Sequence, residues 1–249
     1  MKVSLFITCL VDQFFPETGM SVVTILRRLG VEVEFLEEQT CCGQPAFNSG
    51  FTDEARTLAK RFIEIFKDSE YVVAPSGSCT SMVKVFYPEL LKDEPEWHER
   101  AETLASRTYE FTEFLVNVLG VEDIGACSQG KVALHQSCHL LRELNVRTEP
   151  RRLLNSVKGI EVVELERAEA CCGFGGLFSI KYPHISGGIL QEKIDSINKS
   201  GAEIIVASDV GCLMHIEGGL CRQAARAKTM HIADLLVRND RNTNDVGSK

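Results

Sequence analysis

The 249-residue sequence lacks several features that would each define a class of protein. No apolar run approaches the roughly 18 residues that a membrane helix needs, and no cluster of basic residues is present. The formal net charge is −8, from 27 Lys and Arg against 35 Asp and Glu. We therefore expect no membrane span, and neither nucleic acid nor an anionic membrane surface as a partner.

The sequence also lacks the glycine-rich motifs that bind nucleotide cofactors. Neither G-x-G-x-x-G nor a P-loop follows the first apolar run, so flavin and NAD binding are unsupported. The lack of a hydride carrier argues against a complete dehydrogenase. The apolar stretch in residues 1–11 is too short for a secretion signal and lacks a small-residue cleavage site, so we expect a cytoplasmic protein.

Cysteine is the residue type that is present in excess. Hydrophobic residues make up 44% and charged residues 25% of the chain, which is typical of a globular protein and excludes a coiled coil or a wholly disordered chain. Ten cysteines are fewer than a disulfide scaffold of this size would carry. In a reducing compartment, such a set indicates metal or redox chemistry.

The same spacing of cysteines occurs twice along the chain. Each copy has one lone cysteine, an adjacent pair and a second lone cysteine, and the offsets between the copies are 129, 130 and 133 residues. The first set is Cys9, Cys41, Cys42 and Cys79, and the second set is Cys138, Cys171, Cys172 and Cys212. Flanking segments recur in the same order: 3–9 with 132–138, 71–79 with 204–212, and 110–116 with 231–237. The chain is therefore an internal duplication, with Cys127 and Cys221 outside the repeat as ordinary packing residues.

Each copy alternates short apolar runs with helical patterns. The predicted strands cover residues 3–7, 31–36 and 71–74 in the first copy and 132–134, 160–165 and 204–207 in the second. The predicted helices cover 20–29 and 53–66, then 149–157 and 187–199, and each half ends in more helix. This order indicates an α/β protein of two tandem, duplicated βαβ-type domains, with parallel sheets related by a pseudo-two-fold axis.

The predicted domains are residues 1–125 and 126–238, and residues 239–249 form an expected disordered tail. Every cysteine position of the repeat follows a predicted strand. Because functional sites of parallel sheets lie beyond the carboxyl ends of the strands, the cysteines of each half should meet at one rim.

Four thiolates are a full ligand set for either tetrahedral zinc or a [4Fe–4S] cluster. Adjacent cysteines would strain the chain around one ion, whereas on a polynuclear cluster they reach different irons. The pair therefore favours an iron–sulfur cluster, with structural zinc or, in an exported chain, disulfides as the alternatives.

The doubled pattern resembles a known family. The segments Cys41-Cys-Gly-Gln-Pro-Ala-Phe-Asn-Ser-Gly50, Pro75-Ser-Gly-Ser-Cys79 and Cys171-Cys-Gly-Phe-Gly-Gly176 are similar to those of the cysteine-rich (CCG) domain iron–sulfur oxidoreductases. That family includes the cysteine-rich subunit of heterodisulfide reductase and the iron–sulfur subunits of glycolate and anaerobic glycerol-3-phosphate dehydrogenases. The resemblance is greatest to a stand-alone, two-repeat branch that serves bacterial L-lactate oxidation, and it covers residues 1 to about 238.

The resemblance implies a function and its cofactors. It implies that the eight repeated cysteines hold an iron–sulfur cluster in each half, of the [4Fe–4S] type, with zinc as a possibility in one half. It implies an electron-transfer subunit of a complex that oxidises L-lactate to pyruvate. The implied partners are a ferredoxin-type iron–sulfur protein and a third small subunit.

One departure from the wider family leaves two alternatives open. The heterodisulfide reductase pattern has a fifth cysteine in each repeat, and Ser76 and Asp209 occupy those positions here. A thiol or disulfide oxidoreductase similar to heterodisulfide reductase is therefore one alternative. A zinc-stabilised binding module without redox activity is the other.

Histidines gather in the second copy. His135 and His139 flank Cys138, and His231 and His135 stand where the first copy has Glu110 and Phe6. Such imidazoles could donate hydrogen bonds to cluster sulfur, bind a hydroxy acid or shuttle a proton, although a single histidine is more often a packing residue. Our hypothesis is that these three are catalytic and that the second half is the active one.

Overall fold

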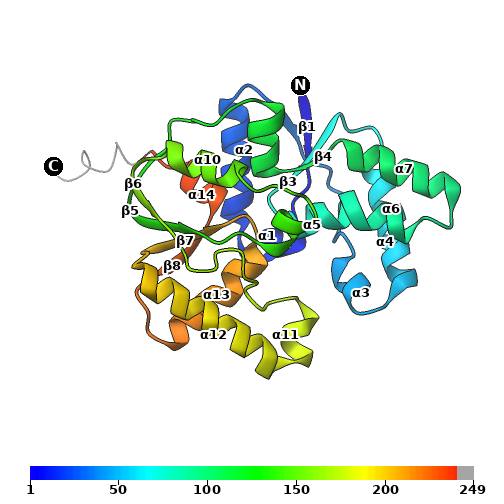
Figure 1. The fold of residues 1–249 in the computed structure, drawn as a ribbon. Coiled ribbons are helices and arrows are strands. Elements are labelled where there is room, and N and C mark those ends of the chain that lie inside the picture. Colours follow the sequence, from blue (N-terminus) through cyan, green and yellow to red (C-terminus); the bar gives the residue numbers. More distant parts are fainter. Residues whose placement is uncertain (240–249) are drawn as a thin grey trace.

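The computed structural model describes residues 1–239, which form two α/β halves of the same design (Figure 1). The first half holds a parallel sheet in the order β2-β1-β3-β4, and the second repeats it as β6-β5-β7-β8. The strands are β1 Lys2–Leu5, β2 Glu32–Glu34, β3 Tyr71–Ala74, β4 Thr108–Glu110, β5 Cys127–Leu134, β6 Lys158–Val163, β7 Ile204–Ala207 and β8 Lys228–His231. The predicted pair of duplicated parallel-sheet domains is confirmed.

Helices connect the strands and cover both faces of each sheet. The first half has α1 Cys9–Phe14, α2 Pro16–Arg28, α3 Gln44–Asn48, α4 Thr52–Phe66, α5 Gly77–Ser81, η1 Met82–Phe86, α6 Tyr87–Leu90, α7 Pro95–Ser106, α8 Phe111–Glu113 and η2 Phe114–Val118. The second half has α9 Cys138–Arg142, α10 Glu149–Ser156, α11 Leu177–Lys181, α12 Pro183–Ser200, α13 Val210–Arg222 and α14 Ile232–Leu236.

The two halves share one hydrophobic core. Helix α2 packs against α14 of the second half (Figure 1), and α10 packs against α8 of the first. Because α10 is the repeat of α2 and α14 is the repeat of α8, these two contacts are the same contact seen across a pseudo-two-fold axis. Val3 and Val73 of the first sheet and Val132 and Val206 of the second belong to this core. Pulling the halves apart would expose it to water.

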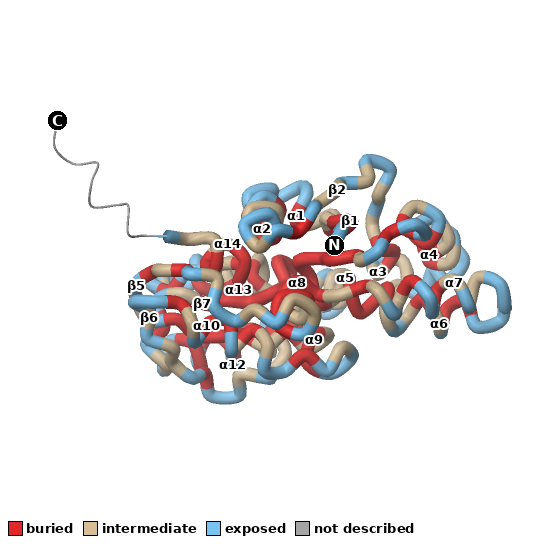
Figure 2. Tube along the Cα trace, turned by 90° about the horizontal axis from the view of Figure 1, so that it is seen from above, coloured by how far each residue is buried: buried red, intermediate tan, exposed pale blue. Residues whose placement is uncertain are grey.

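Each sheet has a second core on its other side. Helices α4, α6 and α7 build it in the first half, around Phe6 and Tyr87, and α12 and α13 build it in the second, around Ala133 and Ile205. Figure 2 shows the result, with buried stretches through the middle of the molecule and exposed residues on the outward side of α2.

The sequence predicts most strands within a few residues and misses two. Strands β3 and β7 have the predicted bounds. More helix follows them as predicted, but β4 and β8, which add a fourth strand to each sheet, lie within that helical part and are not predicted. These edge strands are three and four residues long and partly polar, so they carry no continuous apolar run.

The ends of the second half lie together, since the N–H of Cys127 donates to the carbonyl of Arg238 at 3.1 Å. Of the predicted tail, residue 239 forms a bridge with Cys127, and residues 240–249 lie outside the described residues. None of the helices within residues 1–239 combines the length and apolar character that a membrane crossing requires.

Candidate metal centre

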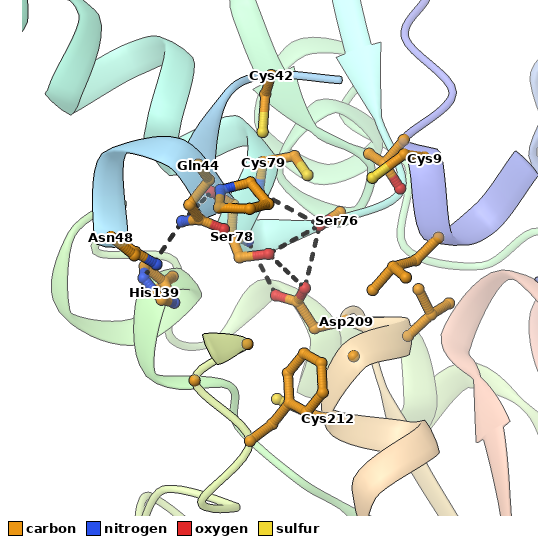
Figure 3. Close-up of a pocket in the computed structure, with 18 of the residues that line it drawn as sticks. Cys9, Cys42, Gln44, Asn48, Ser76, Ser78, Cys79, His139, Asp209 and Cys212 are labelled. Atoms are coloured by element: carbon orange, nitrogen blue, oxygen red, sulfur yellow. Dashed lines mark hydrogen bonds between the residues drawn. The ribbon is translucent and has the colours of Figure 1, made fainter. Parts of the chain in front are cut away.

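All eight repeated cysteines line one cavity of about 240 Å³ between the two halves. In each half, one lone cysteine begins the helix after the first strand, as Cys9 begins α1 and Cys138 begins α9. The adjacent pair follows the second strand, and the last cysteine lies in the helix after the third strand. Figure 3 shows Cys9, Cys42 and Cys79 on one side of this cavity and Cys212 on the other.

The sulfur atoms approach one another as thiols rather than as disulfides. All ten cysteines are free. In the first set, the Sγ atoms of Cys9 and Cys41 are 3.8 Å apart. In the second set, the sulfurs of Cys172 and Cys212 lie within 4.8 Å of each other and of a ring nitrogen of His135. The disulfide alternative therefore has no support from the structure.

Hydrogen bonding within each set favours ionisation of one thiol. Donation from the thiols of Cys42 and Cys9 lowers the pKa of Cys41. The thiols of Cys138 and Cys172 likewise lower the pKa of Cys171, and the N–H of Gly173 adds a contact to its sulfur at 3.3 Å. A thiolate is the form in which cysteine binds metal, so the lowered pKa favours the metal-binding form of one cysteine in each set.

The turn after each cysteine pair requires glycine. Gly43 has φ 84° and Gly173 has φ 90°, both in the left-handed region that other residues avoid. A Cβ atom at Gly173 would lie 2.7 Å from the carbonyl oxygen of Ser186. The Cys-Cys-Gly sequence thus places two adjacent thiols at the cavity, followed by the one residue type that lets the chain turn away from them.

Asp209 joins the two halves beside the cavity. It is 4% exposed, and its carboxylate accepts hydrogen bonds from the hydroxyls of Ser76 at 3.0 Å and Ser78 at 2.7 Å and from the N–H of Ser78 at 2.9 Å (Figure 3). The hydroxyl of Ser137 is a further donor at 3.3 Å. Ser76 and Asp209 are the positions of the absent fifth cysteines, and here they bond to each other across the pseudo-two-fold axis.

The three predicted catalytic histidines lie in different places. Among residues 1–239, the cavity lining includes His139 but neither His135 nor His231. The ring of His139 has Nε2 3.5 Å from the side-chain nitrogen of Gln44 (Figure 3) and Nδ1 3.7 Å from the sulfur of Cys138. His139 therefore connects Cys138 of the second set to the first half.

His231 is a buried helix cap. Its Nδ1 accepts from the N–H of Ala233 at 3.1 Å, and its Nε2 lies 3.2 Å from the carbonyl of Pro75, to which it donates in this tautomer. Glu110, at the matching position, caps α8 by accepting from the N–H groups of Thr112 at 2.8 Å and Glu113 at 3.2 Å. The two residues hold equivalent structural positions in the two halves.

His135 lies behind the second set, 1% exposed, and neither ring nitrogen has a hydrogen-bond partner within the described residues. Burial, together with the nearby charge of Lys193, lowers its pKa to about 3. Sequence reasoning missed Lys193, which is 2% exposed and donates to the carbonyls of Arg167 and Ala168, each at 3.2 Å. The available signal was a lysine at the apolar spacing of Leu190 and Ile194 in a predicted helix.

Comparison with known proteins identifies relatives of this arrangement. The family model described as "CCG: Cysteine-rich domain" matches residues 3–84 and 132–217. The chain is 53% identical over 236 residues to lactate utilization protein A of Bacillus subtilis (strain 168), covering 95% of this chain and 99% of that protein. It is 49% identical over 238 residues to lactate utilization protein A 2 of Bacillus cereus (strain AH820), covering 96% and 98%.

A solved structure shares the fold. A hypothetical protein from Helicobacter pylori superposes with a TM-score of 0.66 at 12% identity, covering all of this chain. This chain spans about half of that longer one, 49% of its length. At that identity the likeness concerns the fold alone.

Proposed function

We propose, from the premise that this chain belongs to the cysteine-rich domain family, that it is the iron–sulfur electron-transfer subunit of a bacterial L-lactate oxidation system. The observation that carries the proposal is the convergence of eight free cysteines, four from each half, on one cavity. The names of the relatives in Bacillus subtilis and Bacillus cereus support the link to lactate utilization.

The donor chemistry fits a cluster in each half. Cys9, Cys41, Cys42 and Cys79 would hold one group, and Cys138, Cys171, Cys172 and Cys212 would hold the other. When bound, a [4Fe–4S] cluster supplies reversible one-electron transfer. Two such groups match the two electrons that leave L-lactate when it becomes pyruvate.

The protein's own groups would supply the rest of the site. Phe174 and Leu10 line the cavity with apolar surface, while Gln44 and His139 face it with polar groups from opposite halves. The imidazole of His139 is placed to hold an anionic hydroxy acid or to take up a proton. Among the predicted catalytic histidines, His139 has the geometry that favours this role best.

The proposed partner proteins would supply the redox functions for which the chain has no motif. No flavin or NAD motif is present in the sequence, so the proposal assigns the removal of the electron pair from lactate to the assembled system rather than to this chain alone. We propose that a ferredoxin-type iron–sulfur protein and a third small subunit complete the system. The heterodisulfide reductase alternative is less favoured, because the fifth-cysteine positions, Ser76 and Asp209, bond to each other.

One observation favours zinc as a second candidate in the second half. His135, Cys172 and Cys212 offer a nitrogen and two sulfurs within 4.8 Å of one another, which is a ligand combination that zinc uses. A chain with one cluster and one zinc would contain about four irons and one zinc.

The functional test is lactate-linked reduction in the reconstituted system. The chain is loaded anaerobically with iron and sulfide, mixed with its two proposed partner proteins, and given L-lactate. We expect the visible absorbance of the cluster to bleach with lactate and to stay unchanged when either partner is left out. A fully iron-loaded chain that remains oxidised in the complete system would contradict the proposal.

A further inference from the structure

The helix that backs the cysteines has the same register in both halves. An offset of 131 residues maps each buried residue of α4 onto a buried residue of α12. The matched pairs are Ala55 with Ser186, Ala59 with Leu190, Phe62 with Lys193, Ile63 with Ile194, and Phe66 with Ile197. Lys193 is therefore the counterpart of a buried phenylalanine.

Two residues that pack together in the first half are both replaced by polar residues in the second half. In the first half, the rings of Phe6 and Phe62 pack edge to face with centroids 4.7 Å apart. The offset of 129 residues that relates Cys9 to Cys138 also relates Phe6 to His135. The aromatic pair behind the first cysteine set thus becomes an imidazole and an ammonium behind the second. Both are buried, at 1% and 2% exposure.

These two polar groups act on the second set. A ring nitrogen of His135 is within 4.8 Å of the sulfurs of Cys172 and Cys212. Burial lowers the pKa of Lys193, and negative charge on the sulfurs of Cys172, Cys171 and Cys212 opposes that shift. The ammonium has two carbonyl acceptors and His135 has none within the described residues. Buried polar groups normally have a hydrogen-bond partner. A metal group held by the neighbouring cysteines would give the imidazole of His135 such a partner.

We propose that Lys193 and His135 give the metal group of the second half a higher reduction potential than that of the first half. The inference rests on the proposed function, in which each half holds a cluster. One-electron reduction adds one negative charge to a partly buried site, and a nearby cation or N–H donor stabilises that charge. The side chains of Phe6 and Phe62 provide the first set with neither a cation nor an N–H donor. An electron that enters the chain therefore resides on the second half.

The direct test is a redox titration of the loaded chain, followed by electron paramagnetic resonance. The wild type should show two reduction steps, and Cys172→Ser should remove the step of higher potential. Lys193→Met should lower the higher step and leave the lower step in place, so that the separation shrinks. Lys193→Arg, which keeps the charge, should restore most of the separation. Phe62→Met is the matched control at the equivalent position and should leave the higher step unchanged.

A second variant separates tuning from ligation. His135→Phe installs the first-half residue and should also lower the higher step while iron stays at the wild-type level. Loss of iron from both Lys193→Met and His135→Phe would mean that these residues hold the group rather than tune it, and would overturn the inference. Equal potentials in a fully loaded wild type, or a shift of the lower step alone, would overturn it as well. A wild type that takes up no iron would instead overturn the proposed function.

Discussion

Behind the cysteines of the first half stand Phe6 and Phe62, in contact with each other, whereas His135 and Lys193 stand at the same places in the second half. The strand order, the helix register and the set of four cysteines are common to both. The arrangement of the cysteines therefore comes from the shared fold, while the electrostatic environment comes from a few buried positions that differ between the halves.

The residues that cap α8 and α14 also differ between the halves. Glu110 caps the first and His231 caps the second, each fully buried and bonded to the backbone at the start of its helix. The residue at this position thus caps the helix in both halves, whether it is an acid or a base. This finding weakens the case for His231 as a catalytic group, whose role in catalysis stays a prediction.

The largest expected effect comes from removing a ligand. Cys172→Ser should cost the second half its metal group and about half of the bound iron, along with several kcal/mol of the stability that the group adds to folding. Cys221→Ser is the control, because that exposed thiol lies outside both sets, and it should keep the full iron content. Metal analysis and thermal unfolding measure both outcomes, and equal losses from the two variants would show that the repeat is misassigned.

The next effect tests the bond between the halves. Asp209→Ala leaves the hydroxyls of Ser76 and Ser78 without their buried acceptor, so we expect a loss of about 4 kcal/mol in unfolding free energy. Asp195→Ala, which changes an exposed aspartate in α12, should change it by less than about 0.5 kcal/mol. Denaturant unfolding decides the matter, and similar losses would mean that the Asp209 network is unimportant to stability.

The two caps should respond to pH in opposite directions. Burial raises the pKa of Glu110 from 4.5 to about 7, so the folded state keeps a proton that the unfolded state releases. Stability then falls as pH rises from about 4.5 through 7, by on the order of 3 kcal/mol. Burial lowers the pKa of His231, so the unfolded state binds the extra proton and stability falls as pH drops below 6.5.

Substitutions at the caps separate these two contributions. Glu110→Gln should flatten the loss toward neutral pH, and His231→Asn should flatten the loss toward acid, because neither new side chain titrates. The measurement is the unfolding free energy of each variant from pH 5 to 8. The same pH profile in both variants would contradict the opposite pKa shifts.

The smallest effect on stability is expected at the cavity wall. His139→Ala should change the unfolding free energy by about 0.5 kcal/mol or less and reduce lactate-linked reduction about tenfold or more. His184→Ala, at an exposed residue of α12, should change neither. Lactate-linked reduction is measured per bound iron, and an unchanged rate in His139→Ala would remove this residue from the site.

The sequence predicts the parts of this molecule that repeat. The cysteine offsets reveal the duplication, and the resemblance of the Cys-Cys-Gly segments to the cysteine-rich domain family is confirmed by the matched residues 3–84 and 132–217. Apolar runs such as 71–74 identify central strands, because those are buried on both faces. The edge strands β4 and β8 give no such signal, since they are short and half-polar.

What the sequence does not predict depends on packing between the halves. Spacing indicates that each set of cysteines meets at one rim, and only the fold reveals that both sets face a common cavity. The hydrogen bond between Ser76 and Asp209 joins residues that are 133 positions apart, so no local sequence pattern predicts it. Lys193 is predictable in principle, because a lysine on the apolar face of a helix needs a buried partner.

The most direct test of the central claim is a count of iron, sulfide and zinc in the chain after anaerobic reconstitution. Four thiolates in each half should bind one [4Fe–4S] cluster each, which gives about eight irons and eight sulfides per chain with little zinc. About four irons and one zinc would leave a single redox group and contradict the account of two clusters. Two zinc ions with little iron would contradict the proposed electron-transfer function itself.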